Sequence, residues 1–263
     1  MGYWSIRGLA QAIRYVLAYA GVPFADTRYQ QGSAPELSRA AWLDVKEKLQ
    51  LDFPNLPCQR THTPNDKSSG SAPKCLCAET SDSSRCACVC VCAFPSIPPD
   101  YLEDELRLTQ STTILRHLGR KHGLSGQSLA EQARCDLVVD TTYDFKSVLV
   151  STAYTRAPAR AEALQDFADR TVPHYFAQFE ALLSRNQAQG WKWLAGDNLT
   201  IADFILFEMV DQTSLMLPGV LENGAYPLLR AFTQRFVELP PIAQYRKWTH
   251  FMARPLNNMA GFQ

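Results

Sequence analysis

Tyr3 is the first residue of the chain whose side chain could take part in chemistry. It stands in a short apolar start, Gly2-Tyr3-Trp4, and a glycine follows at Gly8. A tyrosine at a strand end before a glycine turn can direct its phenol hydroxyl into a cleft, where the hydroxyl can form hydrogen bonds with a ligand. Taken alone, Tyr3 is better explained as a tyrosine packed beside a terminal strand.

A second candidate lies at Gln110-Ser111, directly before an apolar helical pattern at Ile114, Leu115 and Leu118. Ser111 can cap this helix, while unpaired backbone amides face outward. The amides and the dipole at a helix start attract a carboxylate. The same serine would also serve as a plain N-cap, so the segment predicts a helix start and leaves an anion site open.

The cysteines form a third group of potential chemical interest. Seven of the eight lie between residues 58 and 92, and their closest spacings leave one residue between neighbours. Zinc ligands are usually separated by two or more residues, and no histidine pair follows at zinc-finger distance. We therefore expect no metal site, although a loose thiolate cluster stays open. The cysteines are Cys58, Cys75, Cys77, Cys86, Cys88, Cys90, Cys92 and Cys135.

The pattern of residues 1–57 predicts the elements that would position Tyr3. Residues 2–4 and 23–29 are expected strands, and apolar residues at helical spacing over 9–20 predict a helix that stops at Gly21. Residues 36–48 predict a second, irregular helix. This strand-helix-strand-helix opening is typical of a parallel strand pair in an α/β domain.

Residues 58–100 interrupt the pattern with a low-complexity stretch rich in serine and cysteine. The stretch has no helical or strand period outside a short Cys-Val alternation, so we interpret it as an insert. The pattern resumes at residues 101–108 with a predicted hairpin. The helix after it ends near Gly123, which closes a first domain at residues 1–122.

A linker is expected at residues 123–130, followed by an all-helical domain at residues 131–263. Apolar stripes with proline or glycine punctuation predict each helix of this domain. Thr200 and Asp203 have the spacing of a capping box at the start of one of them. The predicted helices are Leu129–Tyr154, Ala159–Arg185, Thr200–Leu215 and Tyr226–Glu238.

Composition limits the classes of partner. Hydrophobic residues make up 46% and charged residues 20% of the chain, and the formal net charge is zero. This balance is typical of an ordinary globular protein and does not favour nucleic acid or an acidic membrane surface as a partner. No apolar run reaches the length of a membrane span. We therefore expect a cytoplasmic protein.

Three segments resemble the mu-class glutathione S-transferases, and they occur in the family's order. The resemblance covers residues 2–57 and 101 to about 250, and the segment from Gly32 to Trp42 looks like the extra loop of the mu class. The matching segments are Gly2-Tyr3-Trp4-Ser5-Ile6-Arg7-Gly8-Leu9, Leu51-Asp52-Phe53-Pro54-Asn55-Leu56-Pro57 and Leu108-Thr109-Gln110-Ser111.

The resemblance implies an α/β thioredoxin-like domain followed by an all-α domain, a homodimer, and a detoxifying transfer of glutathione sulfur onto small hydrophobic electrophiles. Glutathione would be a co-substrate, with no other cofactor. In the family, the tyrosine matching Tyr3 donates a hydrogen bond to the glutathione sulfur. The helix start at Ser111 would hold the γ-glutamyl carboxylate.

Other glutathione contacts are assigned by the same resemblance. Leu56-Pro57 resembles the family's cis-proline step, where the leucine backbone pairs with the cysteinyl part of glutathione. Asp144 would reach the γ-glutamyl amine in the partner subunit, and Arg39, Trp42 and Lys46 would hold the glycyl end. The remaining matched positions are Trp4, Leu9, Asn55 and Gln110.

Tyr154 matches a tyrosine over the electrophile site, where a phenol can stabilise developing charge. Phe53 and Arg116 match dimer-contact positions, with Phe53 as an aromatic key into the neighbouring subunit. Without the resemblance, each of these would be an ordinary packing or surface residue.

Because residues 58–100 interrupt the part of the chain that resembles the family, more than one function stays open. Cys88-Val89-Cys90-Val91-Cys92 is what a TG dinucleotide repeat encodes, so we also consider that residues 58–100 are a retained intron that yields an inactive product. We expect a surface excursion, after which the third strand either restarts at Tyr101 or recruits Cys58 onward. The chain could then be an active transferase, a non-catalytic binder of hydrophobic ligands, or a redox-sensing protein that uses the cysteines.

Overall fold

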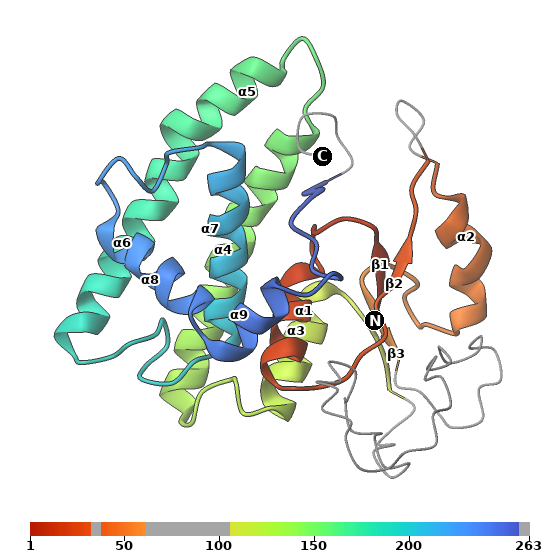
Figure 1. The fold of residues 1–263 in the computed structure, drawn as a ribbon, viewed down its shortest axis with the longest axis horizontal. Coiled ribbons are helices and arrows are strands. Elements are labelled where there is room, and N and C mark those ends of the chain that lie inside the picture. Colours follow the sequence, from red (N-terminus) through yellow and green to blue (C-terminus); the bar gives the residue numbers. More distant parts are fainter. Residues whose placement is uncertain (33–37, 61–105, 258–263) are drawn as a thin grey trace, which may run out of the picture. The chain divides into compact units, whose positions relative to one another are not determined.

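A computed structural model describes residues 1–32, 38–60 and 106–257. Met1–Gln59 and the chain from Leu108 onward group into one compact unit. The fold begins with a small mixed sheet and continues into helices (Figure 1). Most of the insert lies outside the described residues, and so does the first arm of the predicted hairpin at 101–104.

The sheet contains four described strands in the order β2-β1-β3-β4. β1 (Gly2–Trp4) runs parallel to β2 (Thr27–Tyr29) and antiparallel to β3 (Cys58–Arg60), with Gly2 opposite Cys58. The parallel pair predicted from the opening residues is confirmed, although β2 is shorter than expected. β4 spans Arg107–Thr109.

β3 decides between the two expectations for the third strand. Its residues directly follow Pro57, so the third strand of the described chain recruits Cys58 onward, and Tyr101 lies outside the described residues. The predicted insert therefore begins three residues too early, because Cys58–Arg60 belongs to the sheet.

The helix after β1 follows the predicted spacing. α1 (Gln11–Tyr19) buries Ile13, Val16 and Leu17. The chain turns at Gly21, whose φ of 64° is in the left-handed region that glycine tolerates best.

The second predicted helix is shorter than its pattern. α2 (Ala40–Lys46) continues into the 3₁₀ turn η1 (Glu47–Leu49), and Trp42 is its buried residue. Residues 33–37, where the start of this helix and the mu-class loop were expected, lie outside the described residues.

α3 (Ser111–Lys121) packs against α1, and α1 in turn contacts α7 and α9. The expectation that Ser111 is the N-cap is wrong. Gln110 occupies the cap position with a φ of 68° and no side-chain cap hydrogen bond, and Ser111 is the first helical residue.

The helical domain follows the predicted pattern closely. α4 has the predicted bounds, and Ser128 caps it, so the linker ends at residue 128 and not 130. The segment predicted as one helix over 159–185 divides into α5 and α6 around the π-helical turn η2. The elements are α4 (Leu129–Tyr154), α5 (Arg160–Asp166), η2 (Phe167–Thr171), α6 (Val172–Ala188), α7 (Ile201–Met216), α8 (Pro227–Val237) and α9 (Pro240–Arg246).

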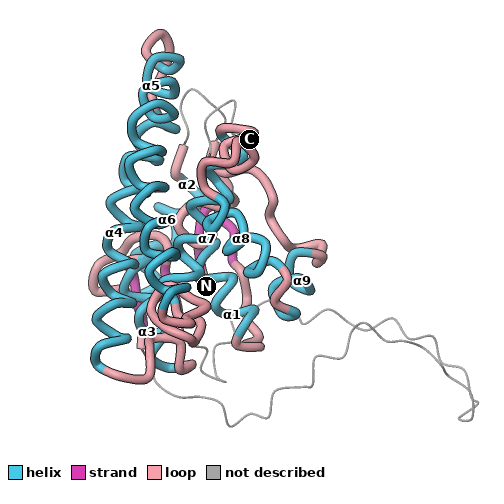
Figure 2. Tube along the Cα trace, turned by 90° about the vertical axis from the view of Figure 1, so that its left-hand side faces the viewer, coloured by secondary structure: helices cyan, strands magenta, loops and turns pink. Residues whose placement is uncertain are grey.

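α7 is the central helix of this domain. Every residue from Ile201 to Val210 is buried, which is typical of a helix surrounded by others. α4 lies beside it, as Figures 1 and 2 show. The predicted capping box is confirmed, because the Asp203 carboxylate accepts from the Thr200 backbone amide at 2.8 Å.

None of the described helices combines the length and the apolar character that crossing a lipid bilayer requires.

Candidate functional site

A cavity of about 350 Å³ brings together six of the residues predicted for the site. Its walls come from β1 and the turn after it, from the segment before β3, from the last turns of α4, and from α7. The predicted residues among its lining are Tyr3, Trp4, Leu9, Asn55, Leu56 and Tyr154.

Tyr3 is held in one orientation by the turn that follows β1. Its side chain is buried, and its hydroxyl accepts a hydrogen bond from the Leu9 backbone amide at 3.0 Å. The turn passes so close that a Cβ at Gly8 would lie 2.6 Å from the Tyr3 hydroxyl oxygen, and Gly8 itself has a φ of +44°. Only glycine fits this position without displacing the phenol.

The protonation state of Tyr3 follows from its surroundings. Burial raises the pKa of Tyr3 to about 12, and the hydrogen bond from Leu9 only partly offsets that effect. The phenol is therefore neutral at physiological pH. Since its oxygen already accepts from Leu9, its own hydrogen is the group that it can donate to a ligand in the cavity.

The proline step before β3 has the conformation that the resemblance implies. The Leu56-Pro57 bond is cis. The Leu56 amide, which would pair with the cysteinyl part of glutathione, donates to the Asn55 side-chain oxygen at 2.9 Å. Asn55 and Leu56 are thus both at the cavity, but the Leu56 amide is already occupied by its neighbour.

Three of the predicted glutathione residues lie on or next to α2 and outside the cavity lining. Arg39 is exposed at the start of the helix. Trp42 is buried, with its ring 5.5 Å from that of Tyr29 in an edge-on arrangement. Lys46 forms an ion pair with Glu47 at 3.3 Å.

Gln110 and Ser111 lie at the start of α3, also outside the cavity lining. Gln110 is exposed. Ser111 is buried, and its hydroxyl accepts a hydrogen bond from the Tyr143 hydroxyl at 2.8 Å. This contact ties α3 to α4.

Two of the residues predicted for subunit contacts are exposed, and the third is paired within its own chain. Phe53 is 76% exposed, which is high for an aromatic side chain, and Asp144 is exposed on α4. Arg116 instead pairs within its own chain, with Asp136 at 2.8 Å and Asp140 at 2.5 Å.

Lys146 is a cavity residue that the sequence did not single out. It lies on α4 with its ammonium nitrogen 3.9 Å from the centroid of the Tyr143 ring. Burial lowers the pKa of Lys146 to about 8. Its position eight residues before Tyr154 is on the same broad face of a helix, which is the signal that could have identified it.

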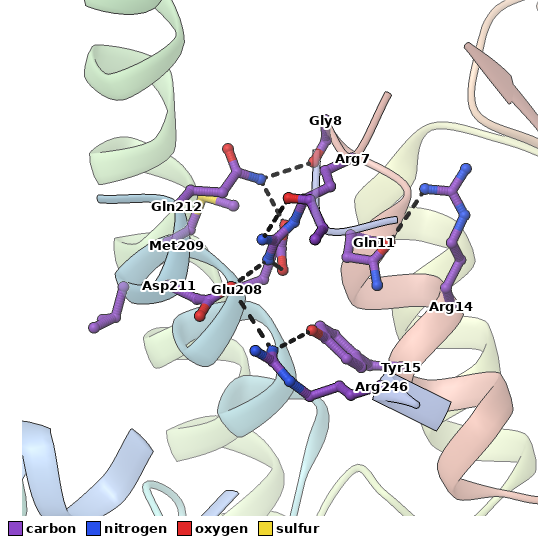
Figure 3. Close-up of polar contacts among 12 residues, drawn as sticks. Arg7, Gly8, Gln11, Arg14, Tyr15, Glu208, Met209, Asp211, Gln212 and Arg246 are labelled. Atoms are coloured by element: carbon purple, nitrogen blue, oxygen red, sulfur yellow. Dashed lines mark hydrogen bonds and ion pairs between the residues drawn. The ribbon is translucent and has the colours of Figure 1, made fainter. Parts of the chain in front are cut away.

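A buried polar network behind the cavity was also missed (Figure 3). Arg7, in the turn after β1, donates from Nε to Glu208 at 3.1 Å and from an Nη to Glu208 at 2.5 Å. The same Nη donates to Asp211 at 2.6 Å. Gln212 donates to Glu208 at 2.7 Å and to the Gly8 carbonyl at 3.4 Å. The network therefore joins α7 to the turn that holds Tyr3.

The chain beyond α9 contacts the same turn from another direction. The Arg7 backbone amide donates to the Pro255 carbonyl at 2.9 Å, and the Gly8 amide donates to the Leu256 carbonyl at 3.1 Å. Leu256 also lines the cavity. The turn is thus hydrogen-bonded to α7 on one side and to the C-terminal segment on the other.

Within the described ranges, no group of three or more histidine, cysteine, aspartate or glutamate side chains is arranged to hold a metal ion. The two described cysteines, Cys58 and Cys135, are both buried as thiols, and burial raises the pKa of each. The thiolate cluster considered from the sequence falls mainly on residues outside the described part of the chain.

Comparison with known proteins gives the same family at both ends of the chain. The N-terminal domain of glutathione S-transferases matches residues 1–58, and the C-terminal domain matches residues 143–248. The crystal structure of the glutathione S-transferase Blo t 8 matches with a TM-score of 0.73 at 23% identity, covering 99% of this chain and 96% of that one. This structural match supports the fold.

Two relatives support the mu-class motifs. Glutathione S-transferase Mu 3 of Macaca fuscata fuscata is 32% identical over 259 residues, covering 98% of this chain and 92% of the relative. Glutathione S-transferase Mu 3 of Homo sapiens is 31% identical over 258 residues with the same coverage. The chain therefore belongs to the glutathione S-transferase family, with mu-class enzymes among its relatives.

Proposed function

We propose that this chain transfers the sulfur of glutathione onto small hydrophobic electrophiles, with glutathione as co-substrate and no further cofactor. The observation that carries the proposal is the Tyr3 hydroxyl. It is a neutral, oriented hydrogen-bond donor at a cavity, with its oxygen engaged by Leu9 at 3.0 Å. Such a donor can stabilise a thiolate without ionising itself.

The chemical gain from this donor follows from the acidity of a thiol. A thiol with a pKa of about 8.5 is only about 3% ionised at pH 7, whereas a pKa of about 6.5 gives about 75% thiolate. Lowering the pKa by two units requires about 2.7 kcal/mol of stabilisation of the anion. One hydrogen bond to a charged sulfur, worth about 1.5–3 kcal/mol, supplies most of it.

The rest of the cavity suits an apolar electrophile. Leu149, Val150 and Ala153 line it from α4, and Met209 lines it from α7. Tyr154 is 39% exposed at the end of α4, where its hydroxyl can stabilise charge that develops on the electrophile. Glutathione thiolate at Tyr3 and an electrophile at these side chains would meet inside one cavity.

The remaining glutathione contacts are proposals that rest on the family motifs. The α3 start offers backbone amides for the γ-glutamyl carboxylate, since Ser111 uses its side chain for Tyr143. Arg39, Trp42 and Lys46 would hold the glycyl end from α2. Asp144 would contribute from the partner subunit, and its exposure leaves it available for that role. The cytoplasmic location stays a prediction from the sequence.

Substitution of Tyr3 by phenylalanine tests the proposal, because it removes the donor and keeps the ring. We expect the rate of conjugation to a chlorodinitrobenzene to fall at least tenfold, and the pKa of the bound thiol to rise towards its solution value near 8.5. Thiolate absorbance against pH measures that pKa. Tyr226→Phe is the matched control, because Tyr226 is outside the cavity and packs against Phe176. An unchanged rate and thiol pKa would remove Tyr3 from the proposed role.

A second function, non-catalytic binding of hydrophobic ligands, is favoured by one observation. The Leu56 amide donates to Asn55, so a peptide-like ligand must displace that contact to pair with it. Isothermal titration with glutathione separates the two functions. Tight apolar-dye binding together with no measurable glutathione binding would favour the second.

A further inference from the structure

Lys146 has no partner of opposite charge among the described residues. In the described part of the chain its ammonium group contacts the face of the Tyr143 ring, with 3.9 Å between the nitrogen and the ring centroid. Burial is the cause that lowers the pKa of Lys146 to about 8, and no nearby carboxylate counters that effect. A half-buried cation with only an aromatic neighbour is poorly stabilised compared with one in an ion pair.

Lys146 is also the one charged side chain among the described residues that line the cavity. The other ionisable groups of the lining are the phenols of Tyr3 from β1 and Tyr154 from α4. α7 contributes Met209 and Gln212 to the lining. The segments at residues 31, 55–56 and 256–257 contribute side chains that do not ionise. Among the described residues, the cavity lining therefore carries one positive charge, that of Lys146, and no negative charge.

The contacts expected for glutathione do not account for this charge. Its glycyl carboxylate is assigned to Arg39, Trp42 and Lys46, and its γ-glutamyl carboxylate to the start of α3. None of these positions lines the cavity. The neighbours that share the α4 wall with Lys146 are the apolar side chains of Leu149, Val150 and Ala153, which face the electrophile in the proposed function.

We propose that Lys146 selects electrophiles that carry a carboxylate, binding that group through a charge-assisted hydrogen bond while the apolar body of the electrophile packs against α4. This proposal rests on the proposed function and names its substrate class. A carboxylate would supply the missing partner of the ammonium group, and such a contact is strongest where water is largely excluded.

A pair of compounds that differ only in charge tests this selection. 4-Chloro-3,5-dinitrobenzoate carries the carboxylate, and its methyl ester does not. In both, the thiolate sulfur forms a bond to the carbon that bears chlorine, and chloride leaves with the electron pair of the carbon–chlorine bond. The thiol proton passes to solvent, and the carboxylate or ester is unchanged.

The measured quantity is the ratio of kcat/KM for the acid to that for the ester. In Lys146→Met, which keeps the length of the side chain and removes its charge, we expect this ratio to fall about tenfold through the KM of the acid. Lys146→Arg should retain most of the ratio, because it keeps the cation. The control is Lys192→Met, which removes an exposed lysine outside the cavity lining.

The pH dependence of the same ratio gives a second readout. Ionisation of the glutathione thiol affects both substrates and cancels in the ratio. Since the ammonium group of Lys146 loses its proton as pH rises through about 8, the ratio for the parent should fall across that range. In Lys146→Met the ratio should be flat.

Two outcomes in the variant would overturn the proposal, and a third would overturn the proposed function on which it rests. Equal losses for acid and ester in Lys146→Met would show a general structural role. A raised KM for glutathione with an unchanged ratio would assign Lys146 to glutathione instead. A parent that turns over neither compound would refute the proposed function. Quenching of tryptophan fluorescence would then still measure whether the acid binds more tightly than the ester, and equal affinity would refute the charge preference itself.

Discussion

Replacing Arg7 by methionine should destabilise the fold more than most single substitutions. The methionine keeps much of the apolar stem but removes the guanidinium that lies between Glu208 and Asp211 (Figure 3). Arg7 is 1% exposed and Glu208 is fully buried, so Glu208 would be left as a buried carboxylate with only the Gln212 amide as a described donor. Asp211 is less affected, because Arg246 lies 3.8 Å away.

The expected cost follows from this arrangement. Removing one partner of a buried ion pair costs about 3–5 kcal/mol, because the remaining charge is uncompensated. The Ala253 carbonyl would also lose a contact with the guanidinium, at 3.4 Å. For a domain with a typical stability of about 5–15 kcal/mol, this is about a fifth of the total or more. Activity should fall too, since the same turn carries Gly8 and the Leu9 amide that orients Tyr3.

The assay is urea unfolding followed by tryptophan fluorescence, at one fixed protein concentration so that any association contributes equally. Glu208→Gln alone should cost about 1.5–3 kcal/mol, because Arg7 retains Asp211 at 2.6 Å. The two substitutions together should cost at least 1 kcal/mol less than the sum of the single costs, since no isolated charge remains. Additive losses, or a loss below about 1 kcal/mol for Arg7→Met, would refute the reasoning.

Two further substitutions test the site and the assembly. Gly8→Ala should reduce conjugation at least tenfold, because the added carbon would lie 2.6 Å from the Tyr3 hydroxyl oxygen and displace it. The control is Gly21→Ala, because Gly21 also has a positive φ, +64°, but an added carbon there would have no neighbour within 4 Å. Equal activity losses in the two variants would show that backbone strain, and not displacement of Tyr3, is responsible. Phe53→Ser should weaken homodimer formation in sedimentation, because a 76% exposed phenylalanine is available to a second subunit. A parent that sediments as an active monomer would contradict the proposed dimer.

The sequence predicted best those elements whose signal is local and periodic. α4 begins at Leu129 and ends at Tyr154 as its apolar stripe indicates, and the Thr200–Asp203 capping box forms as its spacing predicts. α9 escaped prediction because its seven residues begin with two prolines and are too short for a helical period to emerge. The π-helical turn at 167–171 was missed because an apolar stripe continues through it.

Side-chain partners from distant segments were the main source of error. Ser111 has the right type for an N-cap, but it is the first residue of α3, and its hydroxyl accepts a hydrogen bond from Tyr143 on α4. No local rule shows that a residue 32 positions away supplies the partner of that oxygen. The same reason explains why Lys146 was overlooked, since its importance lies in the absence of a carboxylate around it in the described part of the fold.

The position of Tyr3 shows how such long-range contacts bear on chemistry. The phenol is oriented by the Leu9 amide six residues away, but the turn that presents this amide is held by α7 through Gln212 and by the C-terminal segment through Leu256. If the segment of Gln212 or that of Leu256 were displaced, the sequence around Tyr3 would be unchanged, but the Tyr3 hydroxyl would point in another direction. The tyrosine motif is therefore necessary for an oriented donor, but the contacts of Gln212 and Leu256 with Gly8 are also needed to hold the turn that orients it.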